Sequence, residues 1–341
     1  MPPSIPLHCG LYEQQKTAFP KEVKGGLKEI SIVVPCYNEA EALPIFYKET
    51  VSALQKMGVS FEFILVNDGS KDETLSVMKD LAAQDENVFF FSFSRNFGKE
   101  SAMYAGLSHA RGRYAAVMDA DMQDPPSLLP EMYALLQEGE FDCVATRRAG
   151  RKGEPALRSW FAKGFYKLIN RISDADIVDG ARDFRLMKRE MVDAIVEMSE
   201  YNRFSKGLFG WIGFRTHWIS YENVERVAGE TKWNFWGLFK YALEGIFAFS
   251  QTPLSLSSWF GIGTTALAFI SLLVIIIRKL LFGDPVAGWA STICIILFVG
   301  GIQLFCLGII GQYIAKIYLE VKNRPHYIIS DTNDPDAKRI R

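Results

Sequence analysis

The stretch Ile30-Ser31-Ile32-Val33-Val34-Pro35-Cys36-Tyr37-Asn38-Glu39 decides the fold of this chain. It begins as a β-branched run, which is typical of a buried strand. A polar turn at Pro35–Asn38 follows, and then a helical pattern from Glu39 to Met57. The same strand pattern returns, with helical segments between, at residues 61–66, 88–93, 114–118 and 141–145. Apolar strands that alternate with helices predict an α/β fold with a parallel sheet covered on both faces.

Acidic side chains follow three of the predicted strands. Glu39 follows the first strand, Asp68 the second, and Asp119 and Asp121 the fourth. Ligands of parallel α/β sheets bind beyond the carboxyl ends of the strands, so we expect one site at this edge. Asp68 taken alone is equally well explained as part of an Asp-Gly turn.

Asp119 and Asp121 are the candidates for metal ligands. Two carboxylates this close after a buried strand repel each other unless a positive charge lies between them. Mg²⁺ or Mn²⁺ would supply that charge, and Gln123 would be a neutral oxygen ligand. The chain has no GxxxxGK[ST] loop, so we predict a metal shared between these acids and a substrate diphosphate.

The C-terminal quarter contains two long segments without charged residues. Residues 245–277 and 286–315 both exceed the roughly 20 apolar residues that a membrane-spanning helix needs. The 38 basic residues nearly balance the 39 acidic ones, which disfavours a large nucleic-acid-binding surface. We therefore predict a globular domain attached to a membrane hairpin.

Further motifs along the chain carry a resemblance to a known family. Besides the strand ends above, they include Arg95-Asn96-Phe97-Gly98-Lys99, Gln123-Asp124-Pro125-Pro126, Asp183-Phe184-Arg185-Leu186 and Lys206-Gly207-Leu208-Phe209. Over about residues 30–329 the chain resembles glycosyltransferase family 2, in the polyprenyl-phosphate branch of bactoprenol glucosyltransferases and dolichyl-phosphate mannosyltransferases. The resemblance implies a GT-A catalytic domain, which is a Rossmann-like α/β fold with a mostly parallel sheet, plus interface helices and two C-terminal transmembrane helices.

The resemblance and the composition divide the chain into five predicted parts. These are an N-terminal arm (1–29), a GT-A domain (30–232), an amphipathic juxtamembrane helix (233–252), a transmembrane hairpin (253–315) and a cytoplasmic tail (316–341). Basic residues are commoner after the second span than between the spans, which favours a cytoplasmic catalytic domain and cytoplasmic termini. We expect an integral protein of the bacterial inner membrane, in contact with membrane lipids. The resemblance also suggests a homo-oligomer such as a tetramer.

The resemblance also implies a role for individual residues. The nucleotide sugar would be bound by Pro35, Tyr37, Glu39, Asp68, Asp119 and Arg147, with Arg148 or Arg151 as the alternatives to Arg147 for the diphosphate. The lipid phosphate would be bound by Arg203, Lys206, Arg215 and Lys232, and the catalytic residues would be Asp183, Asp121 and Arg185. Asp183 would be either a general base or an orienting group, because a phosphate monoester with a second pKa of about 6 is already ionised near neutral pH.

The predicted reaction is inverting transfer of a hexose, with glucose from UDP-glucose as the first choice, to polyprenyl (undecaprenyl) phosphate. GDP-mannose or another UDP-sugar is the alternative donor. A processive polysaccharide synthase would need more spans and a Gln-x-x-Arg-Trp motif, which the sequence lacks. A non-catalytic membrane scaffold is the alternative from another class, and the acids at 68, 119, 121 and 183 weigh against it.

Overall fold

The computed structural model describes residues 28–149, 171, 178, 180–222, 246–247, 250–282 and 289–337. Within these residues the strands are β1 (Ile30–Cys36), β2 (Phe61–Asn67), β3 (Val88–Phe93), β4 (Tyr114–Val117), β5 (Cys143–Arg148), β6 (Ala181–Lys188), β7 (Thr216–Tyr221) and β8 (Ile329–Thr332). The helices are α1 (Ala42–Met57), α2 (Thr74–Gln84), α3 (Lys99–His109), the 3₁₀ helix η1 (Pro126–Leu128), α4 (Leu129–Gln137), α6 (Arg189–Glu197), α7 (Ser205–Trp211), α9 (Thr252–Phe282) and α10 (Trp289–Val321).

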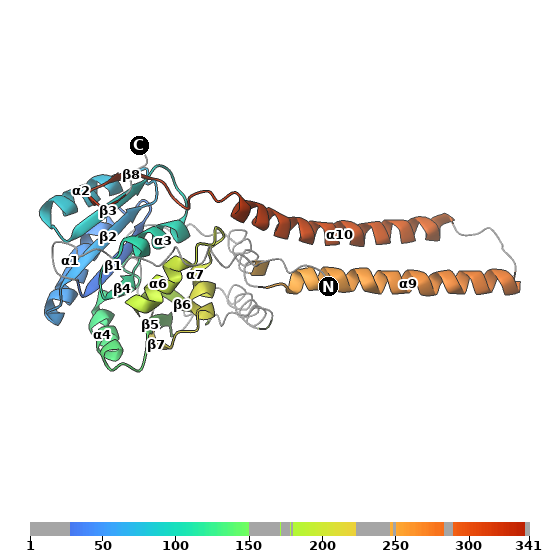
Figure 1. Cartoon of the computed structure of the whole chain (residues 1–341), viewed down its shortest axis with the longest axis horizontal. Helices are drawn as coiled ribbons and strands as arrows, with labels where there is room; N and C mark the ends of the chain where they lie inside the picture. The colour runs from blue at the N-terminus through green and yellow to red at the C-terminus, as the bar shows by residue number, and fades with distance from the viewer. Residues whose placement is uncertain are drawn as a thin grey trace, which may run out of the picture.

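The described strands form one sheet in the order β7-β5-β6-β4-β1-β2-β3-β8, from which α9 and α10 project (Figure 1). β1 pairs in parallel with β2 and β4, β2 with β3, and β5 with β7. β6 is antiparallel to β4 and β5, and β8 is antiparallel to β3. The predicted α/β fold with a mostly parallel sheet is confirmed.

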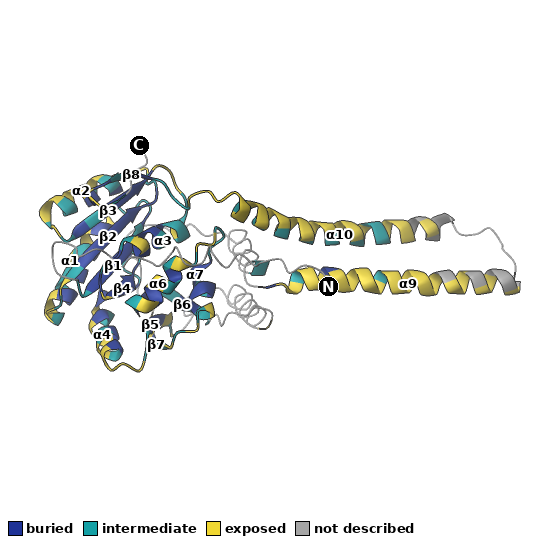
Figure 2. Cartoon of the chain, in the orientation of Figure 1, coloured by how far each residue is buried: buried dark blue, intermediate teal, exposed yellow. Residues whose placement is uncertain are grey.

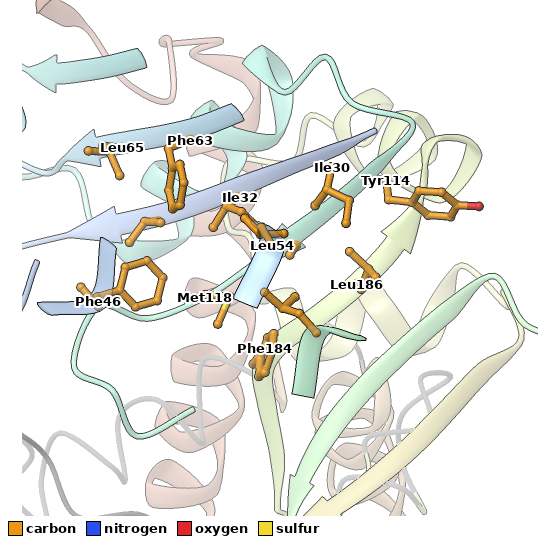
Figure 3. Close-up of a cluster of buried hydrophobic side chains, with 14 of the residues drawn as sticks. Ile30, Ile32, Phe46, Leu54, Phe63, Leu65, Tyr114, Met118, Phe184 and Leu186 are labelled. Atoms are coloured by element: carbon orange, nitrogen blue, oxygen red, sulfur yellow. The ribbon is translucent and has the colours of Figure 1, made fainter. Parts of the chain in front are cut away.

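Helices cover both faces of the sheet because the strand residues alternate in direction. Ile32 and Val34 belong to the core under α1, α2 and α4 (Figure 3), whereas Val33 belongs to the core under α3 and α6. Gly106 allows α3 to lie close to β1, since a Cβ there would be 2.3 Å from Val33 Cγ1. Both faces are therefore buried, as the continuous apolar strands predict.

The first helix begins at Ala42 and not at Glu39, where the sequence pattern placed its start. Asn38 has a φ of 56°, and its backbone N–H donates to Ser70 Oγ at 3.0 Å. Glu39 N donates in the same way to Thr74 Oγ1 at 2.9 Å. These bonds hold the residues after β1 against the loop after β2, so they form a turn at the carboxyl edge of the sheet.

The segment predicted as a C-terminal tail contributes a strand to the sheet. Residues up to Val321 extend α10, and β8 then pairs with β3. Asn333 accepts from Phe90 N and donates to Val88 O, both at 2.8 Å. Next to it, the buried Asp334 accepts from Arg111 Nη2 at 2.7 Å through both carboxylate oxygens. The segment after α10 thus returns to the domain and is fixed to it by strand pairing and by the Arg111–Asp334 ion pair, which together we call the lock.

α9 and α10 are long and apolar enough to cross a membrane, over Thr252–Ile275 and Ile295–Val321. Their apolar side chains are largely exposed (Figure 2), including Trp259 and Leu304 at 70% and 71%. α9 continues to Phe282, so Arg278 lies inside the helix and not in the predicted inter-span loop. The predicted pair of C-terminal apolar helices is confirmed. The predicted helix at 233–252 lies almost wholly outside the described residues. So do nearly all of the N-terminal arm (1–29) and residues 223–232 at the end of the predicted GT-A domain.

Arg111→Met tests the lock between the C-terminal segment and the domain. The substitution leaves the carboxylates of Asp334 and Glu62, both 1% exposed, without their guanidinium partner. We expect a loss of about 3–5 kcal/mol in the free energy of unfolding, measured by denaturant unfolding of the full chain in detergent. Lys79→Ala removes a surface pair with Asp331 in the same region and should cost at most about 1 kcal/mol. Equal effects of the two substitutions would refute the lock.

Candidate functional site

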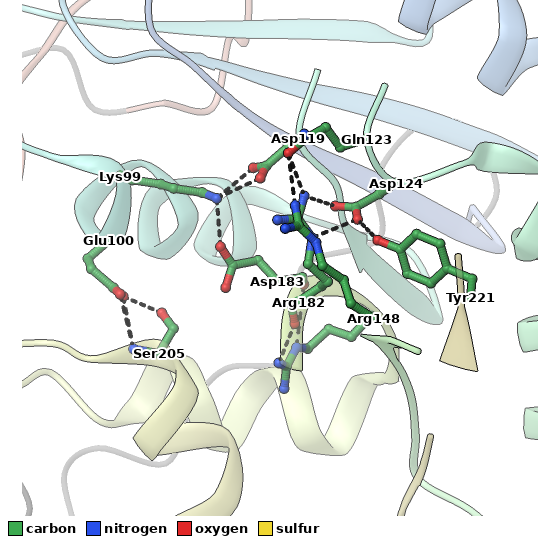
Figure 4. A network of polar contacts seen from close by, with 11 residues as sticks. Lys99, Glu100, Asp119, Gln123, Asp124, Arg148, Arg182, Asp183, Ser205 and Tyr221 are labelled. Carbon is green, nitrogen blue, oxygen red and sulfur yellow. Dashed lines mark hydrogen bonds and ion pairs between the residues drawn. The ribbon is translucent and has the colours of Figure 1, made fainter. Parts of the chain in front are cut away.

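Polar side chains from several elements converge at the carboxyl edge of the sheet (Figure 4). The loop after β4 supplies its acids, and the first residue of α3 supplies a lysine. Further side chains come from the first residues of β6, the last residues of β5 and β7, and the start of α7. They are Asp119, Asp121, Gln123, Asp124, Lys99, Arg182, Asp183, Arg148, Tyr221 and Lys206.

Lys99 joins two of the predicted acids. Its Nζ lies 2.7 Å from Asp119 Oδ1 and 2.6 Å from Asp183 Oδ2. Loss of water around the ammonium opposes its charge, but the two carboxylates outweigh this effect and raise the pKa of Lys99. Desolvation likewise works against the charge of Asp183, and Lys99 and Lys206 reverse this effect and hold the pKa of Asp183 well below its usual range. Asp183 is therefore ionised at any working pH.

A second ion pair, between Arg182 and Asp124, lies on the side of the site next to β7. Arg182 Nε donates to Asp124 Oδ1 at 2.9 Å, and the hydroxyl of Tyr221 donates to the same oxygen. Asp124 is completely buried, and burial raises the pKa of its carboxyl although Arg182 opposes the rise. Breaking such a buried pair by removing one partner is strongly destabilising. The pair therefore ties the acidic loop to β6 and β7.

The acidic loop bends between Asp121 and Gln123. Asp121 Oδ1 accepts from Gln123 N at 3.1 Å, and Met122 between them has a φ of 60°, which is uncommon for a residue with a side chain. The Gln123 side-chain oxygen accepts from Arg148 Nη2 at 3.2 Å and from Arg182 Nη2 at 3.5 Å. In this arrangement the side-chain oxygen of Gln123 faces two guanidinium groups, and its role as a metal ligand stays a prediction.

Asp119 and Asp121 remain chemically suited to a divalent cation. Both are carboxylates, the oxygen donors that Mg²⁺ and Mn²⁺ prefer, and they follow β4 directly. Among the described residues no group of three or more His, Cys, Asp and Glu side chains is arranged to hold a metal ion. A cation at this tip would therefore take its other ligands from a substrate or from water.

The residues predicted to bind the nucleotide lie at the same edge, and the contacts of Asp68 and Arg147 give these two side chains other roles. Pro35, Tyr37 and Glu39 are half-buried at the end of β1. Asp68 is buried, and its carboxylate accepts from Phe97 N at 2.6 Å and Gly98 N at 3.0 Å, so it holds the loop after β3. Arg147 is exposed, and its Nε donates to Ser220 Oγ at 2.8 Å. The neighbouring Arg148 is the β5 arginine that reaches the acidic loop.

The loops after β2 and β3 approach each other closely at Gly69. Its φ is 64°, and a Cβ would lie 2.5 Å from the backbone of Arg95 and of Asn96. A side chain cannot be accommodated there without moving the backbone. Gly69 and Asp68 together therefore fix the loop that leads into Lys99.

Arg185, predicted as catalytic, is 2% exposed. Its guanidinium lies 3.4 Å from the centre of the Phe209 ring, and its Nη2 donates to Arg182 O at 3.1 Å. The side chain therefore positions the backbone around Arg182 and Asp183 from behind, and it is not open to a substrate.

Of the four residues predicted to bind a lipid phosphate, the three that the structure describes do not form one group. Lys206 lies beside Asp183, and desolvation lowers its pKa despite that carboxylate. Arg203 donates to the carbonyls of Met198 and Ile195 at the end of α6. Arg215 pairs with Asp142 at 3.2 Å, before β5 and β7 begin, so it lies at the opposite edge of the sheet. Lys232 lies outside the described residues.

Sequence reasoning assigned no role in the site to Lys99 or Arg182, and it offered Arg148 only as an alternative to Arg147. A usable signal exists for Lys99, which is the first residue of α3. A cation at a helix N-terminus is opposed by the helix dipole, so a lysine there indicates acids nearby. No comparable signal separates Arg148 from Arg147, since only the pleat of β5 decides which of them faces the acids.

Comparisons with known proteins agree with this geometry. Residues 31–196 match the family model described as "Glycosyl transferase family 2". The chain is 43% identical over 314 residues to "Putative glycosyltransferase CsbB" of Bacillus subtilis, covering 92% of this chain and 94% of that protein. It is 44% identical over 306 residues to the "SfII prophage-derived bactoprenol glucosyl transferase" of Shigella flexneri, covering 89% and 98%.

Among solved structures, it is similar to mannosyl-3-phosphoglycerate synthase from Rubrobacter xylanophilus, with a TM-score of 0.44 and 18% identity over 64% of this chain and 72% of that one. The sheet and its acidic edge, taken with the family match, define an α/β enzyme of the GT-A class. The chain belongs to glycosyltransferase family 2.

Lys99→Met tests the ion triad. Without the ammonium, Asp119 and Asp183 lose the charge between them, and we expect sugar transfer (kcat/KM) to fall about 100-fold or more. Lys188→Met is the matched control, because Lys188 pairs with Asp142 at the opposite edge of the sheet. The control should leave transfer unchanged, and a Lys99→Met enzyme with more than half of the wild-type activity would contradict this role.

Proposed function

We propose that this protein is a membrane-bound inverting glycosyltransferase that moves a hexose from a nucleotide sugar to polyprenyl phosphate, with glucose from UDP-glucose as the donor sugar. The observation that carries the proposal is the acidic edge at Asp119, Asp121 and Asp183, flanked by Lys99, Arg182 and Lys206. The names of relatives that share 44% identity with this chain over 98% of their own length support the acceptor and the sugar.

The chemistry needs two anionic substrates at one site. A phosphate oxygen of the acceptor attacks the anomeric carbon of the hexose, and the bond from that carbon to the diphosphate oxygen breaks. Attack from the face opposite the leaving group inverts the configuration, and the nucleoside diphosphate carries away the bonding electron pair. Arg148 and Arg182, both within hydrogen-bond distance of Gln123, would bind the diphosphate through charge-assisted hydrogen bonds.

A divalent cation, Mg²⁺ or Mn²⁺, would be held by Asp119 and Asp121 and would supply Lewis-acid stabilisation of the leaving diphosphate. Asp119 is held by Lys99 at 2.7 Å in this structure. The ammonium keeps the acidic tip in place before substrate binds, and it remains close to Asp183 on the acceptor side.

Asp183 acts as an orienting group and not as a general base. Its lowered pKa makes it a weak base, and a phosphate monoester with a second pKa of about 6 needs no deprotonation near neutral pH. Its partners Lys99 and Lys206 are cations that can approach the acceptor phosphate directly.

The placement of α9 and α10 supports a lipid acceptor. Apolar surface on this scale is not stable in water, so both helices are proposed to cross the membrane. The last turn of α10 is joined to the domain through Glu320, which accepts from Tyr201 N at 2.9 Å. Lys322 and Arg324 follow α10, which favours a cytoplasmic catalytic domain and cytoplasmic termini in the bacterial inner membrane.

Asp121→Ala tests the proposed activity in a panel of labelled donors with polyprenyl phosphate. UDP-glucose should label the lipid with the wild-type protein, and Asp121→Ala should reduce labelling at least about 100-fold while the protein stays folded in the membrane. Asp142→Ala, at the opposite edge, should retain labelling. If no donor in the panel labels the lipid, the proposed function is wrong.

The pH dependence separates the two roles open to Asp183. We expect kcat/KM for the acceptor to fall about tenfold per pH unit below pH 6, because protonation of the acceptor phosphate removes its dianion. Asp183, with its lowered pKa, should add no inflection between pH 5 and pH 9. Asp183→Asn should therefore lower the whole profile without changing its shape. Loss of the acidic limb in that variant would instead identify Asp183 as a base.

A further inference from the structure

A cavity of about 270 Å³ lies outside the catalytic edge. The loop after β3, the start of α3 and two segments near the end of α10 enclose it. Its lining includes Arg95, Asn96, Phe97, Ser101, Tyr201 and His326. None of these residues was assigned a role by the sequence motifs or by the proposed mechanism.

The cavity lies where α10 meets the domain. Tyr201, on one wall, donates its backbone N–H to Glu320 in the last turn of α10. His326, on another, follows the end of α10 at Val321 by five residues, and its Nε2 lies 3.1 Å from Ser199 O. Since α10 is the second candidate span, the cavity would lie at the surface of the bilayer, beside Lys322 and Arg324.

The chemistry of the lining suits an anion. Arg95 is its one charged residue, and no carboxylate lies among the lining residues. The guanidinium lies over the Phe97 ring at 4.2 Å, and its Nη1 donates to Asn96 O at 3.1 Å. Within the described part of the chain no carboxylate comes within ion-pair distance of it. Burial lowers the pKa of His326, so that side chain is neutral and brings no second charge.

The lining also contains apolar surface beside its polar groups. Tyr201 stacks on His326 with ring centres 5.9 Å apart, and the Phe97 ring lies under Arg95. A cation next to aromatic rings at a bilayer surface suits a ligand with a charged group and a short apolar or glycerol portion. A free inorganic anion would contact the cation but would make no use of the apolar surface.

We propose that this cavity binds the phosphate group of a membrane lipid. The ligand class is a phosphate ester with an attached acyl or prenyl chain, and either an anionic phospholipid or the polyprenyl phosphate acceptor meets that description. The inference rests on the proposed function only in taking α10 as a membrane span. A lipid bound in this cavity would connect the bilayer with the loop that leads into Lys99.

Native mass spectrometry of the full chain in detergent tests the proposal. The added probes are phosphatidylglycerol, a short-chain polyprenyl phosphate and inorganic phosphate, each without nucleotide sugar. Arg95→Gln removes the cation, and Ser101→Leu fills the cavity by an independent route. Arg113→Gln is the matched control, because Arg113 is also exposed and lies over an aromatic ring, Tyr114, but at the opposite edge of the sheet.

We expect Arg95→Gln and Ser101→Leu each to weaken binding of at least one lipid about tenfold, with Arg113→Gln unchanged. An effect on phosphatidylglycerol alone would identify a bulk phospholipid, and an effect on polyprenyl phosphate alone would identify the acceptor. Unchanged binding of both lipids, or an effect on inorganic phosphate alone, would overturn the proposal. Because no sugar transfer is measured, failure of the proposed reaction would leave this result unaffected, and the reverse also holds.

Discussion

The ammonium of Lys99, held between the carboxylates of Asp119 and Asp183, is the interaction on which the rest of the site depends. The end of β4 and the start of the antiparallel strand β6 bring these acids to one edge of the sheet, where they are partly removed from water and repel each other. The fold must therefore supply cations at the same place. It does so from α3, β6 and α7, with Lys99, Arg182 and Lys206.

The same need for cations beside the acids explains why several buried residues serve to hold the charged side chains in position. Arg185 supports the backbone of Arg182 and Asp183 from inside the core, and Asp68 holds the loop that delivers Lys99. Neither side chain is open to a ligand. A buried charge is retained only when its hydrogen bonds are satisfied, and here these bonds connect one catalytic loop to the next.

The sequence predicted the sheet well, because continuous β-branched and apolar strands give a strong pattern. It predicted β1 to β5 but not β6, β7 or β8. Charged or polar residues interrupt the apolar pattern in Ala181–Lys188 and Thr216–Tyr221, and Ile329–Thr332 forms a strand only against β3. The positions of the acids were predictable for the same reason as the strands. The partners of the arginines were not: Arg215 faces Asp142 and Arg203 binds the end of α6, and both contacts depend on tertiary packing.

In the proposed reaction, the phosphate groups of the two substrates would account for the two sets of cations around the acids. Arg148 and Arg182 lie on the side of Gln123, whereas Lys99 and Lys206 lie on the side of Asp183. With cations on both sides of the carboxylates, each of two anionic substrates would meet a positive charge, and the two anions would stay apart from each other. The loop from Arg95 to Lys99 then links this centre, over a few consecutive residues, to the cavity at the end of α10. A single loop, held by Asp68 through two backbone N–H groups, thus connects the acidic edge with the part of the protein nearest the proposed bilayer.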